Sequence, residues 1–217
     1  MTSSNYGSFG PLPTARERAW AVGLLLLGSL ISAIGAAYPE NTWLQVGPVV
    51  AVAVALPWIM RRWELSRVSW ACLLLFLLLH LFAAHWTYSD VPYRDWLAAA
   101  GIDPTGLMGK RNMFDRLVHF CFGLLVVRPI VEIESVHVGV HRRLANRLAI
   151  LFVLASSAAY EIFEWTLAIL VSPEAAEAYN GQQGDMFDAQ KDMWMAFAGG
   201  LIALAVIGWQ DRKRRAE

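Results

Sequence analysis

The sequence is poor in charged residues. Only 17% of its 217 residues are Asp, Glu, Lys or Arg, while 57% are hydrophobic and the mean hydropathy is +0.42. Soluble globular domains have about 25% charged residues, so this composition excludes an ordinary soluble domain. The formal net charge is zero, which gives the chain no overall basic character for binding nucleic acid.

Cysteine is also scarce. Cys72 and Cys121 both lie inside apolar runs, where a cysteine behaves as a small core side chain, so we expect neither a disulfide nor a metal-binding pair. The chain has no internal repeat and no low-complexity tract. This excludes a repeat protein and leaves one folded domain as the expectation.

Long hydrophobic runs are what the sequence has instead. A helix needs about 20 mainly apolar residues to cross a bilayer, and six runs have roughly this length, at residues 19–38, 43–60, 68–86, 114–136, 144–171 and 191–209. The second run contains Pro48 and Pro57, which transmembrane helices tolerate where neighbouring helices pack against them. The sequence therefore predicts an all-α, polytopic membrane helix bundle with six transmembrane helices in a lipid bilayer.

The polar ends of the chain suggest its domain limits and its orientation. Residues 1–18 are expected to form a mobile cytoplasmic tail, 19–210 a single transmembrane domain, and 211–217 a basic cytoplasmic tail that binds anionic lipid. Arg16 and Arg18 favour an uncleaved signal anchor over a cleaved signal peptide. In this orientation thirteen of the eighteen Lys and Arg residues lie on the cytoplasmic side, as the positive-inside rule requires. Both termini are therefore predicted to be cytoplasmic.

An acidic cluster precedes the last hydrophobic run. Asp185, Asp188 and Asp192 are three and four residues apart, and Lys191 lies beside the last of them. On a helix these intervals place the three carboxylates on one face. Carboxylates at the mouth of a membrane segment are costly unless they are compensated. A metal ion, a cationic substrate, a shared proton or a buried cation such as Lys191 could compensate them.

Two further pairs of ionisable residues lie in hydrophobic runs. Asp115 and His119 are four apart at the start of the fourth run, an arrangement that suits a metal-ligand pair or an oriented general base; a helix cap beside a satisfied histidine is the plainer alternative. Glu161 and Glu164 are three apart and deep inside the fifth run, where charged residues mark an ion, proton or substrate site. A protonated Glu in an interhelical hydrogen bond is the alternative for this pair.

Four histidines remain besides His119. His80 and His85 are five residues apart in the third run, so on an ideal helix they diverge by about 140°. His85 lies nearer the outer rim and is the better candidate for a site residue. His137 and His141 lie in a basic loop and are expected to be solvated there.

The candidate residues come from the third to sixth runs and are expected to meet in one pocket near the non-cytoplasmic face. They are His85, Asp115, His119, Glu161, Glu164, Asp185, Asp188, Lys191 and Asp192. Carboxylate oxygens with one or two imidazoles suit Zn, Mg, Mn or Ca, and the spacing does not choose among these metals. Such an ion would polarise a phosphoryl or acyl group, or activate water for hydrolysis.

Several motifs in order resemble one known family. The stretches HWTYSDVPY, RNMFDRLVHF, YEIFEW and QGDMFDAQKDMWMAFAGG resemble those of the YjdF-type family of bacterial inner-membrane proteins, which carries a domain of unknown function. The resemblance covers nearly the whole chain after about residue 19. It implies a multi-pass protein of the bacterial inner membrane, and it implies no reaction.

The chain is also distantly similar to VanZ-like membrane proteins, which have an Asp-basic-x-x-His motif, a Glu in the next span, and a spaced Asp/Asp/Asn series before glycines. The positions that fit these three elements are Asp115, Arg116 and His119, then Glu161, then Asp185, Asp188 and Gly199. Glu164 and Asp192 stand where VanZ-like chains tend to have Gln and Asn, so this site is more negative and should need a cation more strongly. The likeness implies a role in the cell envelope or in glycopeptide resistance.

The leading functional hypothesis is a membrane-embedded, metal-dependent hydrolase or transferase that acts on a lipid-linked or cell-envelope substrate. The expected metal ligands are Asp115, His119, Glu161, Asp185, Asp188 and Asp192. Glu164 would act as the general base, Lys191 would neutralise Asp192 or bind a substrate anion, and His85 would lie at the same site. A proton-coupled transporter and a non-enzymatic envelope-binding protein are the alternatives.

Overall fold

The computed structural model describes residues 9–103, 111–171 and 173–216, and these residues form helices joined by turns, without a strand. In chain order the helices are α1 (Ala15–Ala33), α2 (Pro39–Arg62), α3 (Arg67–His85), α4 (Tyr93–Ala99), α6 (Phe114–Glu132), the π-helical turn η2 (Ile133–Val138), α7 (Arg142–Leu170), α8 (Pro173–Asn180) and α9 (Asp188–Ala216). The expected all-α fold is confirmed.

Four of the described helices are long and apolar enough to cross a membrane, namely α2, α3, α7 and α9. The other two long helices are 19 residues each but more charged: α1 has Arg-Glu-Arg at residues 16–18 in its first turn, and α6 carries charged residues at both of its ends. The structure therefore supports four of the six expected spans by length and composition and does not confirm the other two.

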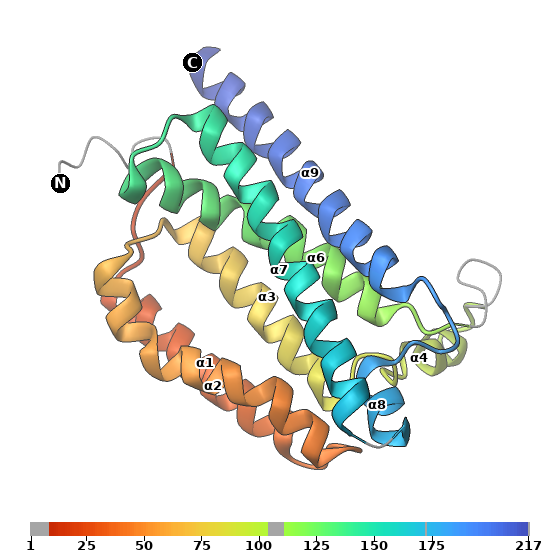
Figure 1. Cartoon of the computed structure of the whole chain (residues 1–217). Helices are drawn as coiled ribbons and strands as arrows, with labels where there is room; N and C mark the ends of the chain where they lie inside the picture. Colours follow the sequence, from red (N-terminus) through yellow and green to blue (C-terminus); the bar gives the residue numbers. More distant parts are fainter. Residues whose placement is uncertain (1–8, 104–110, 172, 217) are drawn as a thin grey trace.

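The long helices lie side by side, and α3 and α6 are at the centre of the bundle (Figure 1). The hairpin of α1 and α2 packs on one side of α3, whereas α7 and α9 pack on α6. The short helices α4 and α8, together with the turn at 181–187, lie at one end of the bundle, which we call the acidic end (Figure 1). The end of α9 and the start of α7, with their arginines, lie at the opposite, basic end.

Two glycine contacts bring α6 and α9 close together. A Cβ atom on Gly123 of α6 would overlap the backbone carbonyl of Ala196, and a Cβ on Gly199 of α9 would overlap the carbonyl of Phe120. Small residues allow two membrane helices to approach to backbone contact. This crossing fixes the first turns of α6 and α9, which carry most of the predicted site residues, against each other.

The basic end is closed by buried polar contacts. Glu132 is fully buried, and its carboxylate accepts hydrogen bonds from Ser66 N at 2.6 Å, Ser66 Oγ at 2.7 Å and Ser69 Oγ at 2.5 Å. Phe9 is also buried, and the guanidinium groups of Arg128 and Arg142 lie over its ring. These contacts join the α3, α6 and α7 regions of the chain at this end.

The stretch 1–18, expected as a mobile tail, is only partly described. Residues 1–8 lie outside the described residues, but Phe9 packs in the core of the basic end. Helix α1 already begins at Ala15, where Thr14 and Glu17 form a capping box with reciprocal hydrogen bonds of 3.2 and 2.6 Å. The helical bundle therefore starts before the boundary that the sequence suggested.

The glycine contact gives a stability prediction. We expect Gly123→Ala to destabilise the protein by about 1–3 kcal/mol, because the overlapping atoms belong to the backbone of α9 and cannot move aside. Gly208→Ala on α9 is the matched control, since a Cβ there meets open space and alanine favours a helix over glycine by up to ~1 kcal/mol. Melting temperatures in detergent measure both; equal values for the two variants would contradict the close packing.

Candidate functional site

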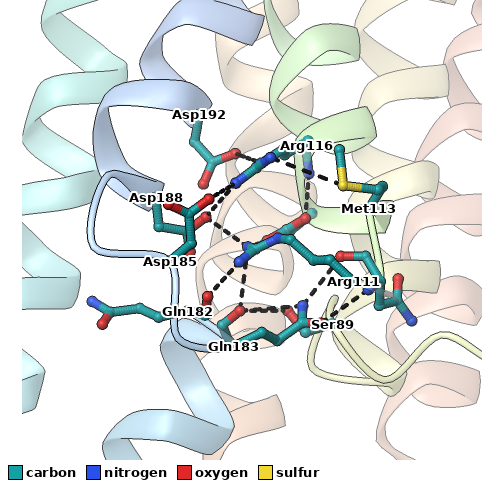
Figure 2. A network of polar contacts seen from close by, with 12 residues as sticks. Ser89, Arg111, Met113, Arg116, Gln182, Gln183, Asp185, Asp188 and Asp192 are labelled. Atoms are coloured by element: carbon teal, nitrogen blue, oxygen red, sulfur yellow. Dashed lines mark hydrogen bonds and ion pairs between the residues drawn. The ribbon is translucent and has the colours of Figure 1, made fainter. Parts of the chain in front are cut away.

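A network of arginines and aspartates occupies the acidic end of the bundle. Arg111, in the connection before α6, donates from Nη2 to Asp115 Oδ2 at 2.8 Å and to Asp188 Oδ1 at 2.6 Å. It also donates to the carbonyl oxygens of Gln182 and Gly181. Arg111 therefore joins the starts of α6 and α9 to the turn between α8 and α9, as Figure 2 shows.

Arg116 and Lys191 complete this network. Arg116 Nη2 donates to Asp185 Oδ2 at 2.6 Å and to Asp188 Oδ1 at 3.1 Å, and its Nε lies 3.8 Å from Asp192 Oδ1 (Figure 2). Lys191 Nζ donates to Asp185 at 2.6 Å. The ammonium group thus pairs with Asp185 and not with Asp192, the partner that the sequence suggested as one option. We call the seven side chains of these contacts the Arg–Asp network: Arg111, Arg116, Lys191, Asp115, Asp185, Asp188 and Asp192.

The Arg–Asp network contains four carboxylates and three cations among the described residues. Arg111, Arg116 and three of the aspartates are mostly buried, whereas the Lys191 side chain is 48% exposed. Buried carboxylates are tolerated when hydrogen-bonded cations compensate them. The arginines, more than Lys191, supply this compensation, and one negative charge remains.

Asp185 lies outside the helix on which it was expected. Helix α9 begins at Asp188, and Asp185 is in the preceding turn, where its Oδ1 accepts a hydrogen bond from Phe187 N at 3.1 Å. It reaches the other aspartates through Arg116, and not along a common helix face. Hydrogen bonds from Lys191 and Arg116 hold the pKa of Asp185 well below its ordinary value.

A second group of ionisable side chains lies one to two helical turns deeper in the bundle than the Arg–Asp network. His119 of α6, Glu161 of α7 and Asp192 of α9 each place one ligand atom within 4.8 Å of the others. We call these three residues the inner cluster. His119 Nε2 lies 3.9 Å from Glu161 Oε1, which is too far for a hydrogen bond.

The inner cluster contains two carboxylate oxygens that lack a hydrogen-bond donor. Glu161 Oε1 and Asp192 Oδ1 are buried and accept no hydrogen bond from the described residues, and their side chains are 9% and 7% exposed. Most buried polar atoms in proteins have a partner. Glu161 Oε1 lies 3.9 Å from His119 Nε2, and Asp192 places one of its oxygens within 4.8 Å of the ligand atoms of both residues, so the position between the three side chains suits a cation or a proton.

Three aspartates of the Arg–Asp network form another possible metal site, but arginines already compensate their charges. Asp115, Asp188 and Asp192 also place oxygens within 4.8 Å of one another, but Arg111 bridges the first two and Arg116 contacts the last two. A guanidinium therefore stands where a metal ion would be needed. The inner cluster, and not this group, is the better candidate for a metal site.

Glu164 lies one turn beyond Glu161 on α7, close to a group of tyrosines. Burial raises the pKa of Tyr179 to about 12, and the nearby Glu164 carboxylate acts in the same direction. Burial likewise raises the pKa of Tyr88 well above its ordinary value. Both phenols are therefore neutral near pH 7 and able to donate hydrogen bonds. Asn180 Nδ2 fixes the backbone here by donating to the Glu164 carbonyl at 3.2 Å.

The structure separates the two histidines of α3. His85 Nδ1 lies 3.0 Å from the carbonyl oxygen of Ser32 on α1, and no contact among the described residues joins it to the acidic groups. His80 Nε2 lies 3.1 Å from the Gln45 carbonyl, its Nδ1 lies 2.5 Å from the Tyr88 hydroxyl, and it lines a cavity together with His119. His80, and not the favoured His85, is the histidine that shares a cavity with the inner cluster.

Seven of the nine candidate residues therefore meet in two adjoining groups, while Glu164 lies next to them and His85 apart. The sequence reasoning left out Arg111 as a partner and gave Arg116 no charge-compensating role. The sequence contained a signal for both, because Arg111 lies directly before the fourth run and Arg116 lies at its start, next to Asp115. Arg111 also stands four residues before Asp115, the spacing of a salt bridge.

The Arg–Asp network predicts unequal effects of removing its cations. We expect Arg116→Gln to destabilise the protein by about 3–5 kcal/mol, because it leaves buried carboxylates without their cation. Lys191→Gln should cost only about 0–1 kcal/mol, since its ammonium is half exposed. Adding Asp188→Asn to Arg116→Gln should restore part of the stability. Thermal unfolding in detergent measures all three, and equal losses for the two single variants would contradict this assignment.

The lowered pKa of Asp185 predicts a pH dependence. Its ion pairs stabilise the folded state fully above the ordinary aspartate pKa of about 3.9, and this contribution is lost as the pH falls towards the folded-state pKa. The difference in melting temperature between the unsubstituted protein and Asp185→Asn should therefore shrink between pH 7 and pH 3. A difference that stays constant or grows on acidification would contradict the prediction.

Comparisons with known proteins agree with the membrane character of the fold. The chain matches the family model described as "Predicted membrane protein (DUF2238)" over residues 18–213. It is 32% identical to "Inner membrane protein YjdF" of Escherichia coli (strain K12) over 194 residues, which cover 86% of this chain and 85% of that protein. No solved structure matches it. The YjdF-type resemblance is confirmed, and the VanZ-like likeness stays a prediction. The chain is an integral membrane protein that belongs to the DUF2238 family of predicted membrane proteins.

Proposed function

We propose that this protein is an enzyme of the bacterial inner membrane that uses a divalent metal ion to hydrolyse or transfer a group of a lipid-linked or cell-envelope substrate. The observation that carries the proposal is the inner cluster, where two carboxylates and one imidazole meet and each carboxylate keeps a buried oxygen that accepts no hydrogen bond from the described residues. Buried carboxylates are costly unless a cation compensates them, and the nearest arginine, Arg116, lies 3.8 Å from Asp192 Oδ1 without donating a hydrogen bond to it, so the arrangement suits a further cation.

The donor set of the inner cluster fits a metal ion. His119 offers a nitrogen, and Glu161 and Asp192 offer oxygens, from three different helices. One imidazole with two carboxylates suits Zn²⁺ or Mn²⁺, whereas Mg²⁺ and Ca²⁺ prefer oxygen ligands throughout. These three residues would hold the ion, and the Arg–Asp network would support them from outside. Asp115, Asp185 and Asp188 are engaged by arginine or lysine and would not be ligands.

The neighbouring side chains support a reaction at this position. A bound metal would polarise a phosphoryl or acyl oxygen or make a bound water more acidic. Glu164 lies one turn from Glu161 and is the carboxylate placed to accept a proton. The neutral phenol of Tyr179 could donate a hydrogen bond to a substrate oxygen. Lys191, at the exposed rim, is the cation that could meet a substrate anion.

We also propose that six helices span the membrane, with the acidic end on the non-cytoplasmic side. Helices α1 and α6 are as long as α3, 19 residues each, and they run alongside the four apolar spans (Figure 1). The positive-inside rule then places the basic end, and with it both chain ends, in the cytoplasm. In this orientation the inner cluster is reached from the outer half of the bilayer.

The interior beyond the inner cluster does not favour a proton-coupled carrier. Below His119, α6 and α9 are in backbone contact at Gly123, and apolar residues such as Val127 and Val131 fill the interface that follows. A carrier needs a polar path to both faces. A non-enzymatic binding protein is distinguished by mutation, since it should tolerate Glu164→Gln with little loss of function.

The metal content of the purified protein tests the proposal. We expect about one Zn²⁺ or Mn²⁺ per chain by elemental analysis, and a loss of most of it in His119→Gln, Glu161→Gln and Asp192→Asn, because each substitution removes one ligand. Asp90→Asn is the control, since Asp90 is an exposed carboxylate near the same end. Near-zero metal in the unsubstituted protein, or equal metal in all variants, would exclude the mechanism.

A further inference from the structure

A cavity of about 480 Å³ opens beside the inner cluster. Its floor is formed by α3 and α6, including Phe76 and Phe122, and its two walls are α2 and α7. Helix α2 packs on α1, α3 and α8, whereas α7 packs on α6, α8 and α9. The two walls therefore belong to separate parts of the bundle, and the space between them forms a groove that runs along the helices.

The helices around the groove suit the hydrocarbon of the membrane. Both of its walls and α3 are apolar enough to span the bilayer, so a ligand that enters between α2 and α7 would come from the lipid. On α2 the lining residues Leu44, Pro48 and Val52 follow one another at intervals of four, which forms a continuous apolar stripe along one helix face. Among the described residues that line the groove there is no Asp, Glu, Lys or Arg.

Polar atoms gather in the part of the groove nearer the acidic end. The side chain of Gln45 is 3% exposed, and neither its amide nitrogen nor its amide oxygen makes a hydrogen bond of normal geometry with a described residue, although the amide lies close enough to interact with the Tyr179 hydroxyl of the same groove. The hydroxyl of Ser157, on the facing wall, is likewise buried and lacks a partner. Leaving such groups unpaired is costly, so they indicate an uncharged ligand with hydrogen-bonding capacity.

The polar part of the groove adjoins the inner cluster. His119 is at once a lining residue of the groove and a member of the inner cluster. Tyr160 of α7 also lines the groove, and its ring lies 5.9 Å from that of His119. Tyr179 of α8 closes the groove at the acidic end. A ligand that fills the groove therefore reaches the inner cluster with its polar end.

We propose that this groove holds one hydrocarbon chain of a membrane lipid, and that an ester or amide group next to that chain hydrogen-bonds to Gln45 and Ser157. The apolar stripe takes the chain, and the carbonyl of the linkage satisfies the buried amide and hydroxyl groups. The head group then lies at His119. This inference deepens the proposed function, because it names a lipid as the substrate class, but the binding of the chain itself needs no metal.

Photolabelling in vesicles tests the groove. The full-length protein is reconstituted in phosphatidylethanolamine and phosphatidylglycerol containing a phospholipid with a diazirine in its acyl chain, and the labelled residues are mapped by mass spectrometry. We expect labels to concentrate on groove residues such as Phe76 and Phe122. Val52→Trp should lower this labelling several-fold, because the indole fills the groove. Val54→Trp is the matched control on α2, since Val54 is 70% exposed and does not line the groove.

Two further variants distinguish a failure of the groove proposal from a failure of the enzyme proposal. Gln45→Leu keeps the volume and removes the amide, so it should reduce labelling by the ester-linked probe and leave labelling by an ether-linked probe unchanged. Glu161→Gln removes a metal ligand and should label like the unsubstituted protein. Equal labelling of the groove in Val52→Trp and Val54→Trp, or labels spread evenly over all lipid-facing helices, would overturn the groove proposal. A metal-free protein with specific labelling would overturn the enzyme proposal alone.

Discussion

The structure depends on the contact between α6 and α9, where glycines let the two backbones touch. This contact aligns the first turn of α6 with the first turn of α9, so residues 69 and 72 positions apart in the chain form one network. Small residues at a crossing are the usual means by which membrane helices approach closely, because burying more apolar surface gains little in lipid. Without this approach Arg116 could not reach both Asp185 and Asp188.

Charge compensation then divides the polar residues into two layers. In the outer layer, arginines donate short hydrogen bonds to the aspartates and so connect α6, α9 and the turn before α9. In the inner layer, Glu161 and Asp192 keep oxygens that no described residue satisfies. Arg111, Arg116 and Lys191 donate hydrogen bonds to Asp115, Asp185 and Asp188, whereas the inner cluster has no such donor for these two oxygens. The groove between α2 and α7 adjoins the inner cluster, because His119 belongs to both.

Much of this arrangement could be predicted from the sequence. The lengths of the hydrophobic runs predicted the long helices, and the helical spacing of the polar residues predicted that Asp115, His119 and Glu161 lie at the same end of the bundle. Both patterns depend on local geometry. The contacts of the side chains could not be predicted in the same way. Asp185 was expected on a helix but lies in a turn, since α9 begins only at Asp188. The choice between His80 and His85 depended on which neighbour each helix face meets, and spacing alone does not contain that information.

The central proposal is that α6, α7 and α9 form one cation site from a histidine and two carboxylates, and the coordination of the metal that this proposal expects in the purified protein tests it most directly. An X-ray absorption spectrum at the edge of that metal should show one imidazole among oxygen ligands, and the imidazole contribution should disappear in His119→Gln. A spectrum without an imidazole, or one that His119→Gln leaves unchanged, would contradict the account.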